Sequence, residues 1–219
     1  PFNNGPIRNM TRPGGFLAAG GGKPDPTFYA DYKVLAFRTP KDEVKMGDLK
    51  PVATTNTGSV DATTLYDDDL ISGIKIPLPK RDAHQWIQFE FAQPFKAQSL
   101  SLATAITSTF GSKDVTTGYV QVSNDGINFK TILSLPGPQH DIRALPVRTY
   151  TFPEVSARFY RITFTGGSGL TTVGDFGSPG YFGPAPTTYN VTEIKLFGEA
   201  RVNRWEDKAH FAPMFDLEA

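Results

Sequence analysis

The stretch VQVSNDGINFKTI, residues 120–132, decides the fold class of this chain. Apolar and polar residues alternate up to Asn124, Asp125 and Gly126, and a second extended run follows that turn. Alternation with a period of two is typical of a strand with one buried face, and an Asp-Gly pair between two such runs indicates a β-hairpin. The sequence therefore predicts an antiparallel hairpin here.

Runs of the same kind predict strands on both sides of the hairpin. With the hairpin's own strands they lie at 31–37, 86–91, 99–104, 118–123, 127–133, 148–152, 157–164 and 191–197. Helical periodicity is nearly absent, and 21 glycines and 18 prolines fall mostly between the runs. This pattern favours an all-β antiparallel sandwich. The period of two predicts a core of Ile87, Phe89, Phe91, Leu100, Leu102, Val120, Val122, Tyr160, Ile162, Phe164, Ile194 and Leu196.

Three regions follow from the distribution of glycine, proline and charge. We expect an irregular N-terminal arm with a first strand at 1–45, a sandwich at 46–199, and a charged tail or linker to a next domain at 200–219. Loops at 105–117 and 165–190 are long enough to suggest a function. Because the chain starts at Pro1 without a methionine, we expect a piece of a larger protein, with any export signal outside it.

Composition excludes several classes of partner. Lysine plus arginine and aspartate plus glutamate each number 22, and such a balance argues against binding to nucleic acid. There is no cysteine, so disulfides and thiolate sites are excluded. No apolar run approaches the ~20 residues of a membrane-spanning helix, so no membrane partner is expected.

Several short motifs, in this order, resemble the galactose-binding-like superfamily, which includes discoidin (type C) domains and many carbohydrate-binding modules. They are LYDDD at 65–69, WIQF at 86–89, VSNDGINF at 122–129, ARFYRI at 157–162 and EI at 193–194. The resemblance spans about 60–198 and implies an eight-stranded jelly-roll β-sandwich.

The flanks are similar to the region that surrounds such a sandwich in glycoside hydrolase family 106, a family of bacterial α-L-rhamnosidases acting on plant polysaccharides. The matching stretches are GPIRNMTRPGGF at 5–16, GGGKPDP at 20–26, VLAF at 34–37 and RVNRWEDK at 201–208. This resemblance implies a non-catalytic module of an exported hydrolase (periplasmic, cell-surface or secreted), with the catalytic residues outside this chain.

The acidic loop is a candidate metal site. Asp67 and Asp69, with Ser72, offer hard oxygen ligands of the kind that Ca²⁺ prefers. In related modules a structural Ca²⁺ often lies between this loop and a glutamate of the last strand, which implies Glu193 here. A plain turn with a solvated acidic face remains an alternative reading.

Sugar recognition requires aromatic faces for the apolar side of a pyranose and planar or charged partners for its hydroxyl groups. Taken singly each candidate is also typical of packing or ordinary surface, but together they indicate a binding face. Trp86 lies opposite the core residues of its strand, and a structural role is favoured over a sugar platform. The candidate residues are Arg81, His84, Phe110, Arg143, Tyr181, Phe182 and Tyr189.

Catalytic motifs are not evident. The three histidines have no paired ligand spacing, no Gly-x-Ser-x-Gly sequence occurs, and the visible carboxylate pairs are neighbours in loops rather than across a cleft. We therefore expect a non-catalytic carbohydrate-binding module that holds an oligosaccharide or polysaccharide near the catalytic domain of its parent hydrolase. A structural spacer that binds no sugar is the alternative, and a discoidin-like adhesion module is the third.

Overall fold

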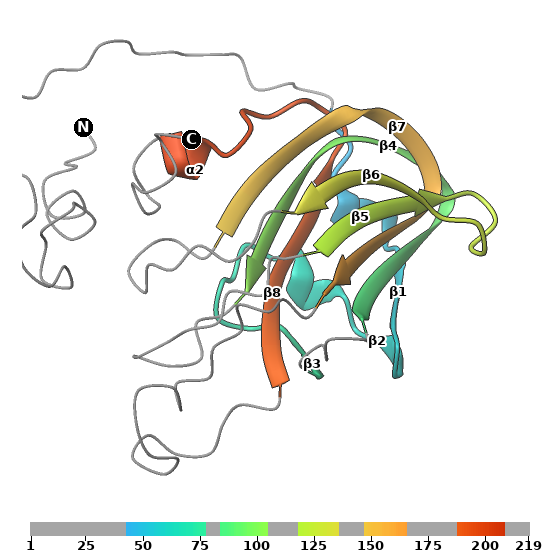
Figure 1. Ribbon diagram of the computed structural model, residues 1–219, viewed down its shortest axis with the longest axis vertical. Coiled ribbons are helices and arrows are strands. Elements are labelled where there is room, and N and C mark those ends of the chain that lie inside the picture. Colours follow the sequence, from blue (N-terminus) through green and yellow to red (C-terminus); the bar gives the residue numbers. More distant parts are fainter. Residues whose placement is uncertain (1–42, 78–83, 105–117, 136–146, 166–187, 209–219) are drawn as a thin grey trace, which may run out of the picture.

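The computed structural model describes residues 43–77, 84–104, 118–135, 147–165 and 188–208 (Figure 1). Eight antiparallel strands and three short helical turns make up this part of the chain, which confirms the predicted all-β class. The strands are β1 (Val52–Thr55), β2 (Gly58–Val60), β3 (Ile74–Pro77), β4 (Gln85–Thr104), β5 (Gly118–Ser123), β6 (Lys130–Leu135), β7 (Val147–Phe164) and β8 (Thr188–Phe197). The helical turns are η1 (Met46–Leu49), η2 (Thr63–Leu65) and α2 (Trp205–Lys208).

Two long strands, β4 and β7, belong to both layers of a sandwich. The order β2-β1-β4-β7-β5-β6 forms one layer through the first half of β4, where Gln85 pairs with Phe164. The second half of β4 pairs with β8, which in turn pairs with β3. Figure 1 shows β4 and β7 arching together over the top of the molecule. The arch therefore connects the two layers with continuous backbone.

For each of the long strands β4 and β7, the sequence predicted two separate strands where the structure has one continuous strand. The segments 86–91 and 99–104 are parts of β4, and 148–152 and 157–164 are parts of β7. Pro94 lies where the β4–β7 register shifts between Glu90 and Phe95, and Pro153 lies opposite the second shift, between Ala97 and Ser99. Proline has no N–H for the ladder, but its φ angle suits extended backbone. The prolines therefore bend these strands without ending them.

Tyr160 lies beneath the arch. Its hydroxyl group donates a 2.6 Å hydrogen bond to the carbonyl oxygen of Phe95 and lies 3.1 Å from that of Val155. The Phe91 and Phe95 rings stack 4.9 Å apart, and the Phe91 ring meets Tyr160 edge-on at 5.8 Å. Burial raises the pKa of Tyr160, so its hydroxyl group stays protonated as a donor.

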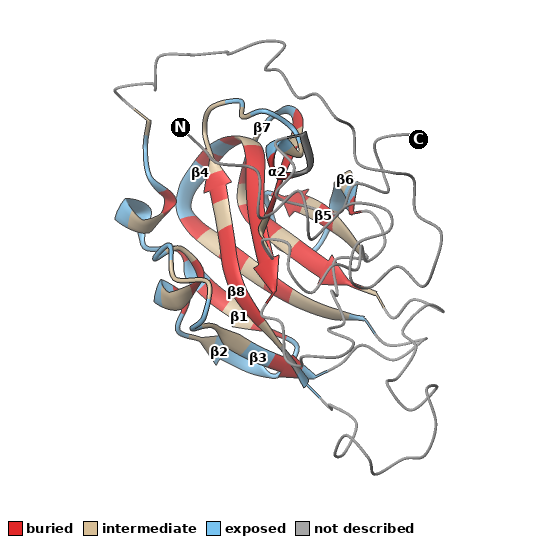
Figure 2. Ribbon diagram, turned by 90° about the vertical axis from the view of Figure 1, so that its left-hand side faces the viewer, coloured by how far each residue is buried: buried red, intermediate tan, exposed pale blue. Residues whose placement is uncertain are grey.

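The core agrees with the predicted alternation. All twelve residues expected inside are buried, and among the largest fully buried side chains are Tyr160, Phe89, Phe91 and Phe164. Figure 2 shows buried and half-buried residues alternating along the strands. Each strand of the first layer therefore has an inner face in the core and an outer face that is partly open to solvent.

The predicted hairpin is present, with a longer turn than expected. β5 pairs with β6 from Val122 opposite Lys130, so residues 124–129 form the turn and the second strand runs to Leu135. Gly126 has a φ angle of 74°, and a Cβ atom there would lie 3.1 Å from the Phe159 ring. This turn requires glycine for both its backbone angle and its contact with β7.

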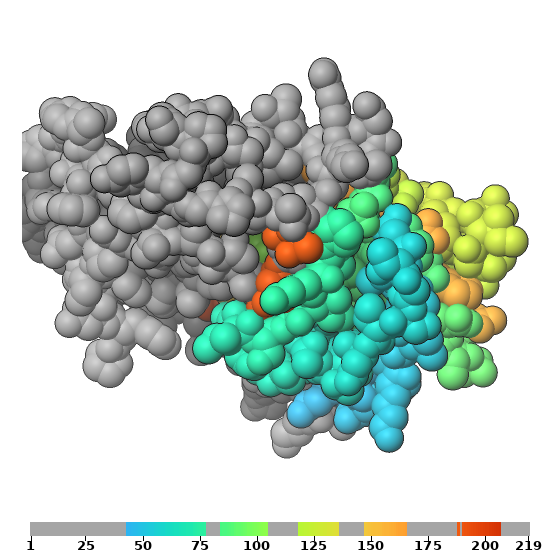
Figure 3. Space-filling view, turned by 90° about the horizontal axis from the view of Figure 1, so that it is seen from below, coloured from blue at the N-terminus to red at the C-terminus, as the bar shows by residue number. Residues whose placement is uncertain are grey.

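Strands β1, β2 and β3 were not predicted, because each has only three or four residues, too few to show an alternating pattern. They complete the end of the sandwich seen in Figure 3, where residues 43–77, in blue to teal, lie together on one face. The expected strand at 31–37 lies outside the described residues. Among the described residues, no helix is long and apolar enough to cross a membrane.

Candidate functional site

The outer face of the first layer carries planar side chains in adjacent rows. Trp86 of β4 is opposite Thr163 of β7, which is opposite Tyr119 of β5. In the next row Gln88 of β4 is opposite Arg161 of β7. Because neighbouring residues Ile87 and Ile162 point into the core, alternation places Trp86, Tyr119, Gln88 and Arg161 on the outer face, where all four are half-buried.

Arg161 lies between two aromatic rings. Its guanidinium carbon is 3.6 Å from the centroid of the Phe129 ring and 4.7 Å from that of Trp86. Its Nε and Nη2 atoms donate hydrogen bonds of 3.0 and 2.6 Å to Oε1 of Gln88. Cation–π contacts with the two rings and the bonds to Gln88 fix the position of the guanidinium. Burial lowers the pKa of Arg161, while Tyr119 opposes this shift.

His84 is the predicted sugar-binding residue that the structure places beside this group. Its ring meets Tyr119 edge-on at 6.3 Å. The β1–β2 turn fixes the start of β4, because Asn56 donates to the His84 carbonyl oxygen at 3.3 Å and accepts from the Trp86 N–H at 2.7 Å. We call Trp86, Gln88, Tyr119, Phe129 and Arg161, with His84 at its edge, the aromatic platform.

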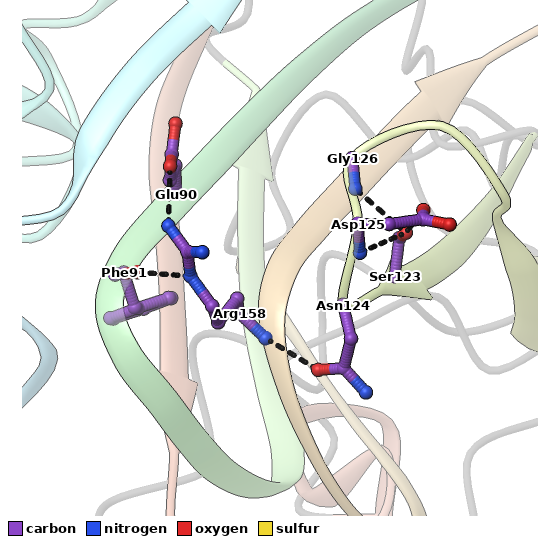
Figure 4. A network of polar contacts seen from close by, with 7 residues as sticks. All are labelled: Glu90, Phe91, Ser123, Asn124, Asp125, Gly126 and Arg158. Carbon is purple, nitrogen blue, oxygen red and sulfur yellow. Dashed lines mark hydrogen bonds and ion pairs between the residues drawn. The ribbon is translucent and has the colours of Figure 1, made fainter.

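A separate ion-pair network borders the aromatic platform (Figure 4). Arg158 contacts Glu90 through Nη2 at 2.8 Å and donates through Nε to the Phe91 carbonyl oxygen at 3.4 Å. The backbone N–H of Arg158 donates to the side chain of Asn124 in the hairpin turn. This network ties β4, β7 and the turn together, and it gives Arg158 a carboxylate partner.

The turn beside the network is held by Asp125. Its carboxylate accepts hydrogen bonds from the backbone N–H groups of Ile127 and Asn128, at 2.9 and 2.8 Å, and from the Asn128 side chain at 2.8 Å. The hydroxyl group of Ser123 donates to the same carboxylate at 2.8 Å. These donors hold the pKa of Asp125 well below its usual range, with the Asn128 side chain contributing most.

Sequence reasoning assigned Trp86 a structural role and did not select Tyr119, Phe129 or Arg161. The structure places Trp86 against Arg161 with part of its surface open. Alternation alone puts Trp86, Gln88 and Arg161 on one face. The pairing of β5 and β6 across the turn was needed to bring Phe129 onto the same face.

The other six predicted sugar-binding side chains are not among those that the structure describes. The side chains of Arg81, Phe110, Arg143, Tyr181 and Phe182 lie outside the described residues. The backbone of Tyr189 lies in β8 opposite Ile76. A role for these residues therefore stays a prediction.

The predicted metal-binding carboxylates of the loop bind its own backbone. The Asp67 side chain accepts from the Asp69 N–H at 2.9 Å, and the Asp69 side chain accepts from the N–H groups of Ile71 and Ser72 at 2.9 and 3.3 Å. Gly73 lies so close to β8 that a Cβ atom there would be 2.2 Å from the Val191 carbonyl oxygen. The loop therefore packs tightly against the strand that carries Glu193.

A lysine ammonium group occupies the space between this loop and Glu193. Lys195 Nζ lies 3.3 Å from Oε1 of Glu193 and contacts the carboxylate of Asp68. Glu193 is only 4% exposed, and its Oε2 atom has no hydrogen-bond partner among the residues that the structure describes. Burial raises the pKa of Glu193, and Lys195 opposes this shift.

The carboxylates do not fit a calcium ion as they stand. Within the described ranges no three histidine, aspartate or glutamate side chains lie close enough together to hold a metal. The unpartnered Glu193 oxygen is a possible ligand, but the neighbouring ammonium already supplies positive charge there. A site formed by Asp67, Asp69, Ser72 and Glu193 stays a prediction.

Both flanks of the sandwich are attached to it by side chains. Thr149 donates to the buried carboxylate of Glu206 from its N–H at 3.0 Å and its hydroxyl group at 2.7 Å. Arg201 pairs with Glu43 and lies over the Phe197 ring. The segments before β1 and after β8 are thus held against the sandwich.

The chain matches one known family along its whole length. The model of glycoside hydrolase family 106, described as alpha-L-rhamnosidase, matches residues 1–219. No curated protein sequence matches the chain.

Solved structures are similar to the chain in fold. A rhamnosidase from Novosphingobium sp. PP1Y has a TM-score of 0.51 at 19% identity; the match covers 74% of this chain and 12% of that chain. The chain thus spans about an eighth of that protein's length. A chitosan-binding module from Paenibacillus sp. IK-5 has a TM-score of 0.45 at 18% identity and covers 68% of this chain and 96% of that chain. A Clostridium perfringens module in complex with GalNAc-beta-1,3-galactose has a TM-score of 0.44 at 15% identity, covering 70% and 99%.

Proposed function

Because the chain belongs to the alpha-L-rhamnosidase family, glycoside hydrolase family 106, we propose that it is a non-catalytic carbohydrate-binding module of a larger exported hydrolase. The module holds plant glycan near the catalytic domain of the parent, whose catalytic residues lie outside this chain. Its contribution is effective concentration: a substrate held by the module meets the catalytic site without a second diffusional encounter.

The aromatic platform is the observation that carries this proposal. Trp86, Phe129 and Tyr119 are half-buried, so each offers ring surface on an outer face of the sandwich. Aromatic faces pack on the C–H groups of a pyranose, while fixed planar groups such as Arg161 and Gln88 bind its hydroxyl groups. Because strands carry most of these side chains, the platform is rigid before ligand binds, which lowers the entropic cost of binding.

Titration of the chain with oligosaccharides tests the proposal. A panel of rhamnose-, galactose- and galacturonate-containing oligosaccharides is added while NMR amide shifts are followed. We expect saturable shifts in β4, β5 and β7 around the aromatic platform. Trp86→Ala should weaken binding about tenfold or more, since loss of a stacked ring costs ~1–3 kcal/mol. Trp205→Ala is the matched control, because Trp205 is exposed and lies outside the platform.

A structural spacer is the second candidate function, and the attached flanks favour it. The buried Glu206–Thr149 pair and the Arg201–Glu43 pair fix the segments that enter and leave the sandwich. Such a module sets the position of its neighbours in the parent chain. If no member of the panel shifts any amide at millimolar concentration, carbohydrate binding is wrong and the spacer function stands.

A further inference from the structure

Arg161 has no carboxylate partner among the described residues, and this distinguishes it from Arg158 on the same strand. Arg158 lies three residues before Arg161 in β7 and pairs with Glu90 of β4 at 2.8 Å. Other ion pairs among the described residues join Lys96 with Glu154, Lys195 with Glu193 and Asp68, and Arg201 with Glu43. Only a neutral amide, that of Gln88, accepts hydrogen bonds from Arg161 in the described structure.

One edge of the Arg161 guanidinium has no hydrogen-bond partner in the described part of the chain. The guanidinium carbon lies over the Phe129 and Trp86 rings, and Gln88 occupies the edge formed by Nε and Nη2. A guanidinium has five N–H donors, so the edge formed by Nη1 and the second Nη2 hydrogen remains. The spacing of those two donors matches the two oxygens of a carboxylate.

The charge of Arg161 is also costly where it lies. Its side chain is half-buried between two rings, and burial disfavours the charged form. An anion bound at the open edge would compensate this cost, and the bond would be strengthened by the apolar surroundings. A neutral sugar hydroxyl compensates much less of it. The platform is thus better matched to an anion than to a neutral ligand.

We propose that the aromatic platform binds acidic carbohydrate, with Arg161 holding the carboxylate of a uronic acid residue in a bidentate ion pair. Stacking on Trp86 or Tyr119 holds the ring of that sugar or its neighbour, and Gln88 positions the guanidinium. This inference rests on the proposed carbohydrate-binding function and adds the class of ligand. A carboxylate from a protein side chain has the same chemistry, so the test includes an acidic peptide.

A matched pair of ligands tests this. A tri-galacturonate and its carboxyl-reduced form, in which each carboxylate is a hydroxymethyl group, are titrated into the 219-residue chain by calorimetry or NMR. We expect the acidic form to bind at least about tenfold more tightly. Because salt screens an exposed ion pair, this preference should fall as the salt concentration rises from about 0.05 to 0.5 M. A tetra-glutamate peptide should not bind, since it has no pyranose to stack.

Three variants assign the effect. Arg161→Gln should remove the preference, so that the acidic and the reduced trisaccharide bind this variant equally. Arg161→Lys should restore part of the preference, because a lysine keeps the charge and loses the fork. Arg158→Gln, in the neighbouring ion pair, should keep the preference (Figure 4). Thermal unfolding of each variant verifies that it is folded. If Arg161→Gln does not fold, Arg161→Lys provides the test of the preference instead.

The outcomes separate the two proposals. Equal binding of the two trisaccharides, or a preference that survives in Arg161→Gln, overturns the acidic ligand and leaves carbohydrate binding in place. Binding of the peptide as tightly as the sugar overturns carbohydrate recognition by the platform and indicates a protein partner. Absence of binding by both trisaccharides and by every member of the oligosaccharide panel overturns both proposals.

Discussion

The hydroxyl group of Tyr160 on β7 holds the backbone of β4 at Phe95, 2.6 Å away, where β4 turns from one layer of the sandwich to the other. Tyr160→Phe removes that donor and leaves the buried carbonyl oxygen of Phe95 without its bond. We expect the free energy of unfolding to fall by about 1–2 kcal/mol. Urea denaturation followed by far-UV circular dichroism measures the change.

The control for this variant is Tyr119→Phe, which also removes a phenolic hydroxyl group but on the half-exposed outer face. Its unfolding midpoint should stay close to that of the unmodified chain. Equal midpoints for Tyr160→Phe and the unmodified chain would show that the bond beneath the arch contributes nothing to stability.

The hydrogen bonds to Asp125 predict that the free energy of unfolding depends on pH. The folded-state pKa of Asp125 lies below its unfolded value of about 3.9, because Asn128, Ile127 and Ser123 donate to the ionised carboxylate. The stabilisation is therefore present above the unfolded pKa and is lost as pH falls toward the folded one. In Asp125→Asn this contribution is absent at every pH.

The measurement is the difference in unfolding free energy between the unmodified chain and Asp125→Asn at about pH 6, 4 and 2.5. We expect the difference to be largest at pH 6 and to shrink as the pH is lowered. Asp48→Asn, at an exposed position, is the control. A difference that is constant with pH would mean that the hydrogen bonds to Asp125 do not favour its ionised form.

The hydrogen bonds between Glu206 and Thr149 predict how firmly the segment after β8 is held against the sandwich. The Glu206 carboxylate is fully buried and accepts two hydrogen bonds from Thr149, so Glu206→Ala leaves two donors unpaired. We expect a loss of about 2–3 kcal/mol and faster proteolytic cleavage within 201–208. Glu154→Ala, at a side chain 57% exposed, should change neither. Unchanged cleavage in Glu206→Ala would contradict a C-terminal segment that is held against β7 by this carboxylate.

The position of the Lys195 ammonium group predicts how the melting temperature of the chain responds to calcium. Lys195→Ala removes the ammonium group between Asp68 and Glu193 and leaves their carboxylates uncompensated. We expect this variant to melt at a lower temperature and to regain stability with millimolar Ca²⁺, because a ligand that binds only the folded state stabilises it. Lys75→Ala, at an exposed position, is the control.

Two outcomes are informative for the calcium site. A melting temperature of the unmodified chain that ignores both Ca²⁺ and EDTA would support the ammonium group as the local cation. A rise with Ca²⁺ in the unmodified chain, lost in Glu193→Gln, would support the metal site predicted from the sequence.

The alternation of apolar residues was sufficient to predict the core and the fold class, because a strand with one buried face repeats every two residues. It did not predict that the segments around Pro94 and Pro153 continue as single strands, since a proline is equally compatible with a bend and an end. The short strands β1 to β3 gave no signal, because their pairing, of β2 with β1, of β1 with β4 and of β3 with β8, makes them strands.

The candidate site was harder to predict for a related reason. Sequence reasoning selected loop residues by type, of which His84 lies at the edge of the aromatic platform. Tyr119, Phe129 and Arg161 come together only through the register of three strands. Asp68 and Lys195 show the same limit, because their contact joins residues far apart in the chain.

The sharing of β4 between the two layers has a consequence for synthesis on the ribosome. The second half of β4 pairs with β8, where Leu100 faces Leu196. At roughly 5–20 residues per second, β8 emerges on the order of 5–20 s after its partner. During that interval an apolar strand has an unpaired edge, which can pair with other nascent chains. Expression at low temperature with a holdase chaperone should therefore raise the yield of folded protein more than any change to its surface.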